Sequence, residues 1–183
     1  MGELVKAPTT APVVAKNTGG GETHQYLTFT LGGEMFAVGI LNVKEIIEYG
    51  NLTEIPMMPA FIRGVINLRG AVVPVIDLAA RFGGKVSQVQ RRTCIVIVEV
   101  RQDEAKHDIG IMVDAVSEVL EIPAADIEPP PAFGAKIRAD FIAGMGKVNG
   151  KFVIILEIQK VLSVDEMALL ADMSQAHAET AVT

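Results

Sequence analysis

The sequence has few of the residue types that mark disulfide-linked or membrane-spanning proteins. Tryptophan is absent, aromatic residues make up 5%, and cysteine occurs once, as Cys94. A single cysteine excludes an internal disulfide and is typical of a reducing compartment. No apolar run reaches the roughly 20 residues of a membrane helix, and the N-terminal residues lack a signal core. These absences predict a soluble cytoplasmic protein without membrane insertion.

Basic residues are also too few to indicate nucleic-acid binding. The sequence has 16 Lys and Arg against 22 Asp and Glu, a formal net charge of −6, and proteins that bind phosphate backbones usually carry a basic stripe. The three histidines stand at no metal-ligand spacing, and no glycine-rich phosphate loop follows a strand. The sequence therefore predicts no metal site and no cofactor. Half of its 183 residues are hydrophobic, enough for a sizeable core.

Two parts of the sequence resemble each other in the same order. Phe61-Ile62-x-Gly64 matches Phe141-Ile142-x-Gly144, and Gly70 matches Gly150, both with an offset of 80 residues (141 − 61 and 150 − 70). Upstream, residues 43–48 parallel residues 116–121 with an offset of 73 (116 − 43). Two copies are too few for a solenoid. The duplication predicts two small β domains of one architecture, packed side by side.

Each copy contains about five short apolar runs separated by turn residues. This spacing favours small closed or partly closed barrels, because closure removes free strand edges. Ser163-Val164-Asp165-Glu166 is a capping box, which predicts a helix through about Met173. We therefore predict a mainly β fold of two five-stranded barrels with a short C-terminal helix. The predicted boundaries are residues 1–24 for a disordered tail, 25–88 and 89–162 for the two barrel halves, and 163–183 for the C-terminal helix and tail.

Several side chains could support chemistry, but each has a simpler structural interpretation. Cys94 lies in the apolar run 93–100, where a buried thiol packs in a core and is inert. The residues that follow this run, 102–108, are expected to form a charged loop. Asp77 and Glu157 hold matched positions in the two copies. They could form an acid–base couple, but two repeated helix caps are the simpler interpretation. Met57 and Met58 fit a contact surface and a core equally well.

The stretch 61–77 predicts a hairpin that turns at Asn67-Leu68-Arg69-Gly70. Arg63 and Arg69 place two cations beside this turn, which suggests a surface that meets a partner. The second copy has a plain Asn149-Gly150 turn, so the fold can be built without Arg69. Arginine anchors interfaces through bidentate contacts, and we predict this role for Arg69. The alternative is a solvated turn charge.

The hairpin sequence, followed by Val73-Pro74-Val75-Ile76-Asp77-Leu78, resembles the signature of the CheW family of bacterial chemotaxis coupling proteins. Supporting similarity occurs in Val43-Lys44-Glu45-Ile46, in residues 113–120 and in Glu166-Met167-Ala168-Leu169-Leu170. The resemblance covers about residues 25–173. It implies two SH3-like five-stranded β-barrels side by side.

The resemblance also implies a non-catalytic adaptor. Family members link the cytoplasmic tips of chemoreceptors to the regulatory domain of the histidine autokinase CheA, with the receptor tip in a groove between the barrels. The residues carried over as interface candidates are Val43, Glu45, Gly64, Asn67 and Arg69. Neither a kinase module nor a receiver domain accompanies them, as expected for a stand-alone adaptor.

Two other functional classes compete with the adaptor. A small enzyme could use Asp77 or Cys94 in a cleft between the barrels, but the sequence offers no converging nucleophile, base and metal set. A small-barrel nucleic-acid binder conflicts with the negative charge and the scarcity of aromatic residues. Neither alternative has positive support in the sequence.

Overall fold

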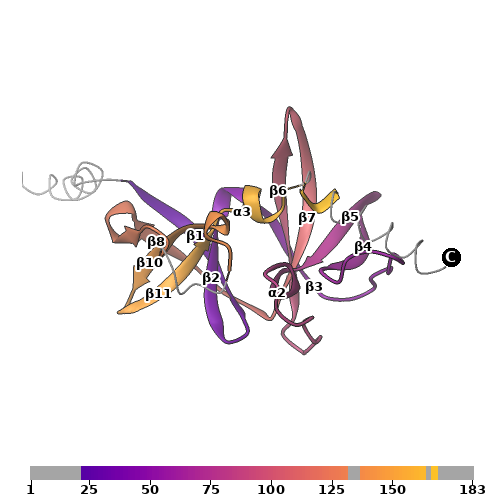
Figure 1. Cartoon of the computed structure of the whole chain (residues 1–183), viewed down its shortest axis with the longest axis horizontal. Helices are drawn as coiled ribbons and strands as arrows, with labels where there is room; N and C mark the ends of the chain where they lie inside the picture. The colour runs from indigo at the N-terminus through magenta and orange to yellow at the C-terminus, as the bar shows by residue number, and fades with distance from the viewer. Residues whose placement is uncertain (1–21, 132–136, 164–165, 169–183) are drawn as a thin grey trace, which may run out of the picture.

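The computed structural model describes residues 22–131, 137–163 and 166–168. Two twisted β-sheets lie side by side, with the β6–β7 hairpin projecting from the second (Figure 1). The first sheet contains six strands in the order β8 (Ala115–Pro123), β1 (Thr23–Leu31), β2 (Glu34–Gly39), β11 (Lys151–Leu156), β10 (Ile142–Val148) and β9 (Ile127–Glu128). The second contains β3 (Val43–Glu48), β6 (Cys94–Gln102), β7 (Ala105–Val113), β5 (Ala71–Asp77) and β4 (Ile62–Leu68).

Short helical turns connect these strands. They are η2 (Ile40–Asn42), α2 (Leu78–Arg81), η3 (Ala124–Asp126), η4 (Ala139–Phe141) and α3 (Ile158–Val161). The two sheets repeat one pairing scheme: β3 is antiparallel to β6 as β8 is to β1, and β5 is parallel to β7 as β11 is to β2. The predicted mainly β, SH3-like architecture with two equivalent halves is therefore confirmed. The barrels are open rather than fully closed; in the second, Thr53 bridges to Val65 beside the edge strand.

The predicted division of the chain at residues 88 and 89 does not separate the sheets. The β1–β2 hairpin pairs with β8 and β11 of the second copy, whereas β6–β7 pairs with β3 and β5 of the first. Each barrel is thus completed by a hairpin from the other half of the sequence. A repeat shows which segments are equivalent, but it does not show which of them are partners, so the exchange was missed.

Three hydrophobic clusters explain why the exchange is stable. One cluster lies inside the second sheet around Ile95 and Ile97, and another inside the first sheet around Ile155. The largest cluster combines residues of both sheets, including Phe29 and Val96. Alternate residues of β6 therefore face two different cores, which accounts for its near-continuous apolar sequence. Because the largest core is shared, the two barrels form one folding unit.

Some element boundaries differ from the predictions. β1 begins at Thr23, inside the predicted tail, because its first residues pair with β8. The expected charged loop at 102–108 is mostly the start of β7, with a tight turn at Asp103. Cys94 is half-buried at the start of β6 rather than fully buried. Replacing Cys94 with serine would therefore not carry the full free-energy cost of burying a new hydroxyl group.

The predicted hairpin turns are present, but of the two matched caps predicted at Asp77 and Glu157 only Asp77 caps through its side chain. Gly70 and Gly150 occupy equivalent hairpin turns with φ of 88° and 80°. Asp77 caps α2 by accepting a hydrogen bond from the Ala80 N–H at 3.3 Å, whereas Glu157 makes no such side-chain cap. Ser163 Oγ accepts from the Glu166 N–H at 3.3 Å, as the capping box predicts. The predicted end of that helix lies outside the described residues, as do residues 1–21.

Candidate functional site

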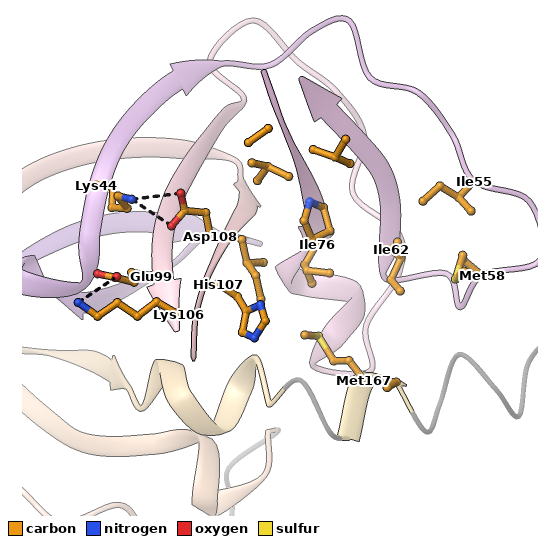
Figure 2. A pocket seen from close by; sticks show the side chains of 16 residues that line it. Lys44, Ile55, Met58, Ile62, Ile76, Glu99, Lys106, His107, Asp108 and Met167 are labelled. Carbon is orange, nitrogen blue, oxygen red and sulfur yellow. Dashed lines mark hydrogen bonds and ion pairs between the residues drawn. The ribbon is translucent and has the colours of Figure 1, made fainter. Parts of the chain in front are cut away.

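A groove of about 680 Å³ opens where β5 and β7 separate (Figure 2). These two parallel strands pair from Val75 with Gly110 to Asp77 with Met112. The residues that come before this paired stretch, 71–74 in β5 and 106–109 in β7, line the groove. The hollow is therefore a fork in the sheet, with apolar residues at its base.

The groove has an apolar floor and a charged wall. Ile62, Ile76 and Ile109 lie at the floor, and Val72 is 71% exposed at its edge. On the β3–β6–β7 side, Lys44 Nζ lies 3.1 Å from Asp108 Oδ2 and Lys106 Nζ lies 3.8 Å from Glu99 Oε2, as Figure 2 shows. Such a surface suits an amphipathic segment that buries one face and keeps charge on the other.

The remaining sides of the groove come from segments outside the sheet. Ile55 and Met58 belong to the loop before β4, and Met167 and Ala168 belong to the C-terminal helical turn. Met58 is half-buried and lines the groove, and Met57 is 55% exposed, so neither belongs to the fully buried core. Of the two interpretations left open by the sequence, the core role is thus disfavoured, and the contact surface stays a prediction.

Arg69 and Glu45 form an ion pair; neither lines the groove, although Lys44, the neighbour of Glu45, does. Arg69 Nη2 lies 2.5 Å from Glu45 Oε1, although β3 and β4 are the opposite edges of their sheet. The Arg69 side chain is 71% exposed and that of Glu45 is 27% exposed. An exposed ion pair contributes little to stability. The pair is a charged, accessible feature placed between the two edges of the barrel.

Arg69 occupies a turn position that suits arginine poorly. Its φ is 52°, like the φ of 51° at Asn149 in the equivalent turn. Two-residue hairpin turns of this type favour Asn-Gly because a left-handed conformation is costly for most side chains. Residues held in such conformations concentrate at functional sites. The turn thus keeps an unfavourable residue whose side chain is largely exposed.

The other three predicted site residues shape this region from within. Asn67 Oδ1 accepts a hydrogen bond from the Gly70 N–H at 2.9 Å and so braces the Arg69 turn. Gly64 lies at a register shift of the β4–β5 hairpin, against the backbone of Thr53. Val43 is half-buried and packs against the shared core. The structure therefore pairs Glu45 with Arg69 and gives the other three supporting positions.

Arg63 and Asp77 turn inward, away from any partner surface. Arg63 donates to the Tyr49 hydroxyl and to the Ser87 carbonyl oxygen, both at 3.3 Å. Asp77 is fully buried and accepts from the Ser87 N–H at 2.6 Å and from its hydroxyl at 2.8 Å. The expectation that both arginines beside the turn face a partner is thus wrong for Arg63, which ties the 83–93 loop to β4.

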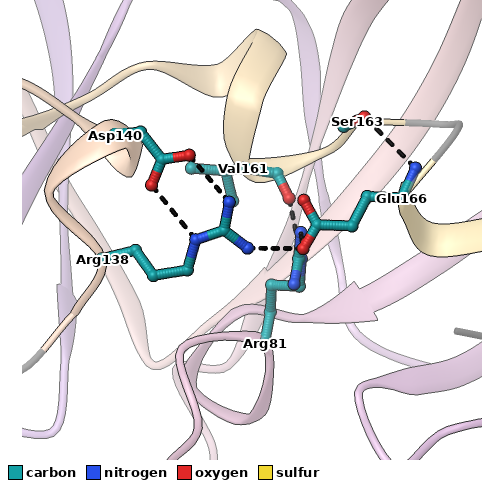
Figure 3. Close-up of polar contacts among 6 residues, drawn as sticks. All are labelled: Arg81, Arg138, Asp140, Val161, Ser163 and Glu166. Atoms are coloured by element: carbon teal, nitrogen blue, oxygen red, sulfur yellow. Dashed lines mark hydrogen bonds and ion pairs between the residues drawn. The ribbon is translucent and has the colours of Figure 1, made fainter.

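A cluster of four charged residues, which we call the clamp, joins the two barrels (Figure 3). It consists of Arg81 in α2, Arg138, Asp140 in η4 and Glu166 in the C-terminal helical turn. Arg138 binds Asp140 at 2.7 Å and also pairs with the carboxylate of Glu166. Arg81 lies 3.4 Å from the same Glu166 oxygen. From the residue pattern only a capping role could be predicted for Glu166, because its partners are distant along the chain.

The clamp shifts the pKa of its members in the directions expected for ion pairs. Hydrogen bonds from Arg138 lower the pKa of Glu166 and that of Asp140 below their ordinary values. The same bonds raise the pKa of Arg138. Burial lowers the pKa of Arg81, and Glu166 opposes this effect. Arginine nevertheless stays charged at all working pH values.

The clamp predicts a pH dependence of stability on the acid side. Because the pKa of each carboxyl group is lower in the folded than in the unfolded state, their stabilisation is complete above the ordinary glutamate value of 4.5 and is lost as the pH falls through the folded pKa. The free energy of unfolding, measured with urea, should therefore fall more steeply between about pH 6 and about pH 3 for the wild type than for Arg138→Gln. Parallel curves would contradict this assignment.

Comparisons with known proteins identify the family. The CheW-like domain family matches residues 25–166. This chain belongs to the CheW-like family. Its CheW relatives include Chemotaxis protein CheW of Klebsiella aerogenes, 37% identical over 86% of this chain and 93% of the relative, and that of Rhizobium meliloti, 34% identical over 81% and 92%. Protein FrzA of Myxococcus xanthus is 30% identical over 75% of this chain and 84% of its own length.

A solved CheW structure has the same fold. The scaffolding protein TtCheW from Thermoanaerobacter tengcongensis is 36% identical, with a TM-score of 0.69 over 76% of this chain and 88% of that chain. In the part of the CheW-like chain that the structure describes, no helix is long and apolar enough to cross a membrane. The same residues contain no group of three or more His, Cys, Asp or Glu arranged to hold a metal ion.

Proposed function

We propose that this protein is a non-catalytic cytoplasmic adaptor that couples the cytoplasmic tips of chemoreceptors to the histidine autokinase CheA. The observation that carries the proposal is an apolar groove in a CheW-like chain, which also carries an exposed Arg69 paired with Glu45. The relatives are named as chemotaxis proteins and one as a scaffolding protein, which supports a coupling role. No catalytic step is required of any residue.

The groove is the proposed receptor site. A receptor tip would place apolar side chains against Ile62, Val72 and Ile109 and its polar side chains toward the charged wall. Apolar grooves of this kind bind amphipathic segments through a few anchor residues. The kinase regulatory domain, which resembles this fold, would use another part of the surface. The Arg69–Glu45 pair would contact one of these two partners.

The two side chains named for the enzyme alternative, Asp77 and Cys94, do not line the groove. Asp77 is fully buried with its oxygens bonded to the Ser87 loop and the α2 cap, and it does not line the groove. Cys94 donates to the Arg92 carbonyl oxygen at 3.3 Å and does not line the groove either. The two side chains named for catalysis therefore do not share a common site.

A charge placed in the groove tests the receptor assignment. Val72→Glu puts a carboxylate at the edge of the apolar floor, and we expect receptor-tip binding to weaken by about tenfold. Val119→Glu is the matched control, because Val119 is 47% exposed on β8, outside this groove. Isothermal titration with a purified receptor tip measures both. Equal affinity of Val72→Glu and the wild type would contradict the groove as the receptor site.

A further inference from the structure

The groove has a wall from the C-terminal helical turn that its duplicate lacks. An equivalent hollow of about 690 Å³ lies at the fork between β11 and β2, lined by residues such as Met35 and Phe152. The first groove is lined in addition by Met167 and Ala168 from the C-terminal helical turn. This wall has no counterpart among the residues that line the second hollow. Its position must therefore be set by contacts outside the two sheets.

Glu166, adjacent to this wall, is held from both barrels. Arg138 precedes η4 in the first barrel and pairs with Glu166 Oε2, while Arg81 ends α2 in the second and lies 3.4 Å from the same atom. The next residue, Met167, donates its N–H to the Ser163 carbonyl oxygen at 2.9 Å and is 9% exposed. Fixing the Glu166 carboxylate therefore fixes the turn that carries Met167.

The two arginines need the negative charge of Glu166. The guanidinium carbons of Arg81 and Arg138 lie 4.9 Å and 4.4 Å from the centre of the Phe141 ring, so two cations share one aromatic residue. Arg81 is 5% exposed, and its Nε donates to the Val161 carbonyl oxygen at 2.8 Å. Without Glu166, a buried cation would lose its ion-pair partner, which is costly.

The position of Arg81 makes this contact central to the barrel junction. Arg81 and Val161 are equivalent in the duplication, as are Phe61 and Phe141, with an offset of 80 in both cases (161 − 81 and 141 − 61). Arg81 contacts all three residues: it binds Val161 and lies over both rings. One side chain therefore bridges equivalent points of the two barrels, and Glu166 lies at the end of that bridge.

We infer that Glu166 is a positioning residue for the groove: held by Arg138 and Arg81, it fixes Met167 and Ala168 as the wall against which a groove ligand packs. The ligand is the receptor tip, so this inference rests on the proposed function. The clamp couples the width of the groove to the junction between the barrels. A ligand that packs against Met167 and Ala168 therefore also affects the contacts that Glu166 makes with both barrels.

Glu166→Gln tests the inference because it keeps the shape of the side chain and removes its charge. We expect hydrogen exchange of the Met167 amide to accelerate by about tenfold and receptor-tip affinity to fall by about fivefold. Binding of the CheA regulatory domain should change by less than about twofold. A purely structural defect would weaken both partners alike. Arg138→Gln should reproduce this split if Glu166→Gln folds poorly.

Two further variants separate charge pairing from general destabilisation. Arg138→Lys keeps a cation for Glu166 and should restore most of the receptor affinity that Arg138→Gln loses. Asp140→Asn removes the other partner of Arg138, leaves the Glu166 pair intact, and should leave the Met167 amide unchanged.

The outcomes distinguish the inference from the proposed function. Unchanged Met167 exchange in Glu166→Gln and Arg138→Gln, or faster exchange with unchanged receptor binding, would overturn the positioning role. If the wild type binds no receptor tip while Met167 exchange accelerates as expected, the proposed function fails and the positioning of the wall stands without its ligand.

Discussion

Arg69→Asn is expected to weaken binding of the receptor tip or of the kinase regulatory domain by about 2 kcal/mol, or roughly thirtyfold, without lowering stability. The substitution removes an exposed guanidinium that pairs with Glu45, and exposed pairs contribute little to folding. Interface arginines, in contrast, often dominate binding energy because they form several directed hydrogen bonds.

The same substitution should make the turn more favourable. Asn tolerates a φ near 52° better than Arg, and Asn-Gly is the preferred dipeptide for this hairpin turn. We expect a gain of about 0.5–1 kcal/mol, which corresponds to a rise of about 2 °C in the unfolding midpoint. Arg69→Ala, which keeps the strain but removes the charge, should lose affinity with a nearly unchanged midpoint.

Asn149→Arg is the matched control for Arg69→Asn. It places arginine at φ 51° in the equivalent turn of the other barrel, where Glu118 is the counterpart of Glu45 and lines the same hollow as Asn149. Stability should fall by about 0.5–1 kcal/mol while binding is retained. Titration against each partner, with a thermal melt alongside, measures both effects. Unchanged affinity of Arg69→Asn for both partners would contradict the interface role, and a collapsed melt would assign Arg69 to folding.

Gly64→Ala is expected to cost roughly 3–5 kcal/mol of folding free energy. A Cβ at position 64 would lie 2.2 Å from the Thr53 carbonyl oxygen and 2.9 Å from its carbon. These are backbone atoms, held by hydrogen bonds of 2.9 and 2.8 Å between Thr53 and Val65, so they cannot move aside without breaking the bridge. The φ of 149° at Gly64 adds strain for any side chain.

The duplication supplies a control for this prediction. Gly144 is equivalent to Gly64, but a Cβ there would lie 2.5 Å from the Ile127 Cγ2 methyl and 3.2 Å from the Glu128 carbonyl oxygen, the nearest backbone atom, and its φ is not positive. Gly144→Ala should therefore cost only about 1–2 kcal/mol. At Gly50 nothing lies within 4 Å, and alanine should change stability by less than about 0.5 kcal/mol. Denaturant unfolding that ranks Gly64→Ala with Gly50→Ala would contradict the close approach.

The duplication and the turn chemistry made much of this fold predictable. Matched glycines, apolar runs and Asn-Gly signals identified two equivalent β halves, and the equivalent turns at Gly70 and Gly150 confirm them. The exchange of hairpins was not predictable, because both β1–β2 and β6–β7 have the apolar pattern of a buried hairpin and either could pair with either half. Pairing depends on the short η2 connection, which leads directly from one sheet to the other.

The candidate site was predictable where its residues lie close in sequence or match a motif. Arg69 was singled out because its turn differs from its counterpart, and the family pattern added Glu45. Arg63 was misassigned because the sequence does not show whether a long side chain near the end of a strand points inward or toward solvent. The clamp was missed because Arg81, Arg138 and Glu166 are far apart along the chain and meet only through the barrel junction.

The most direct test of the adaptor role is recovery of a ternary complex. Purified receptor tips and the CheA regulatory domain should co-elute on size-exclusion chromatography in the presence of this protein and elute separately in its absence. Val72→Glu should remove the receptor tip from the complex while the kinase domain stays bound. If this protein binds neither partner, or if either partner displaces the other, the chain does not couple receptor to kinase and the adaptor account is wrong.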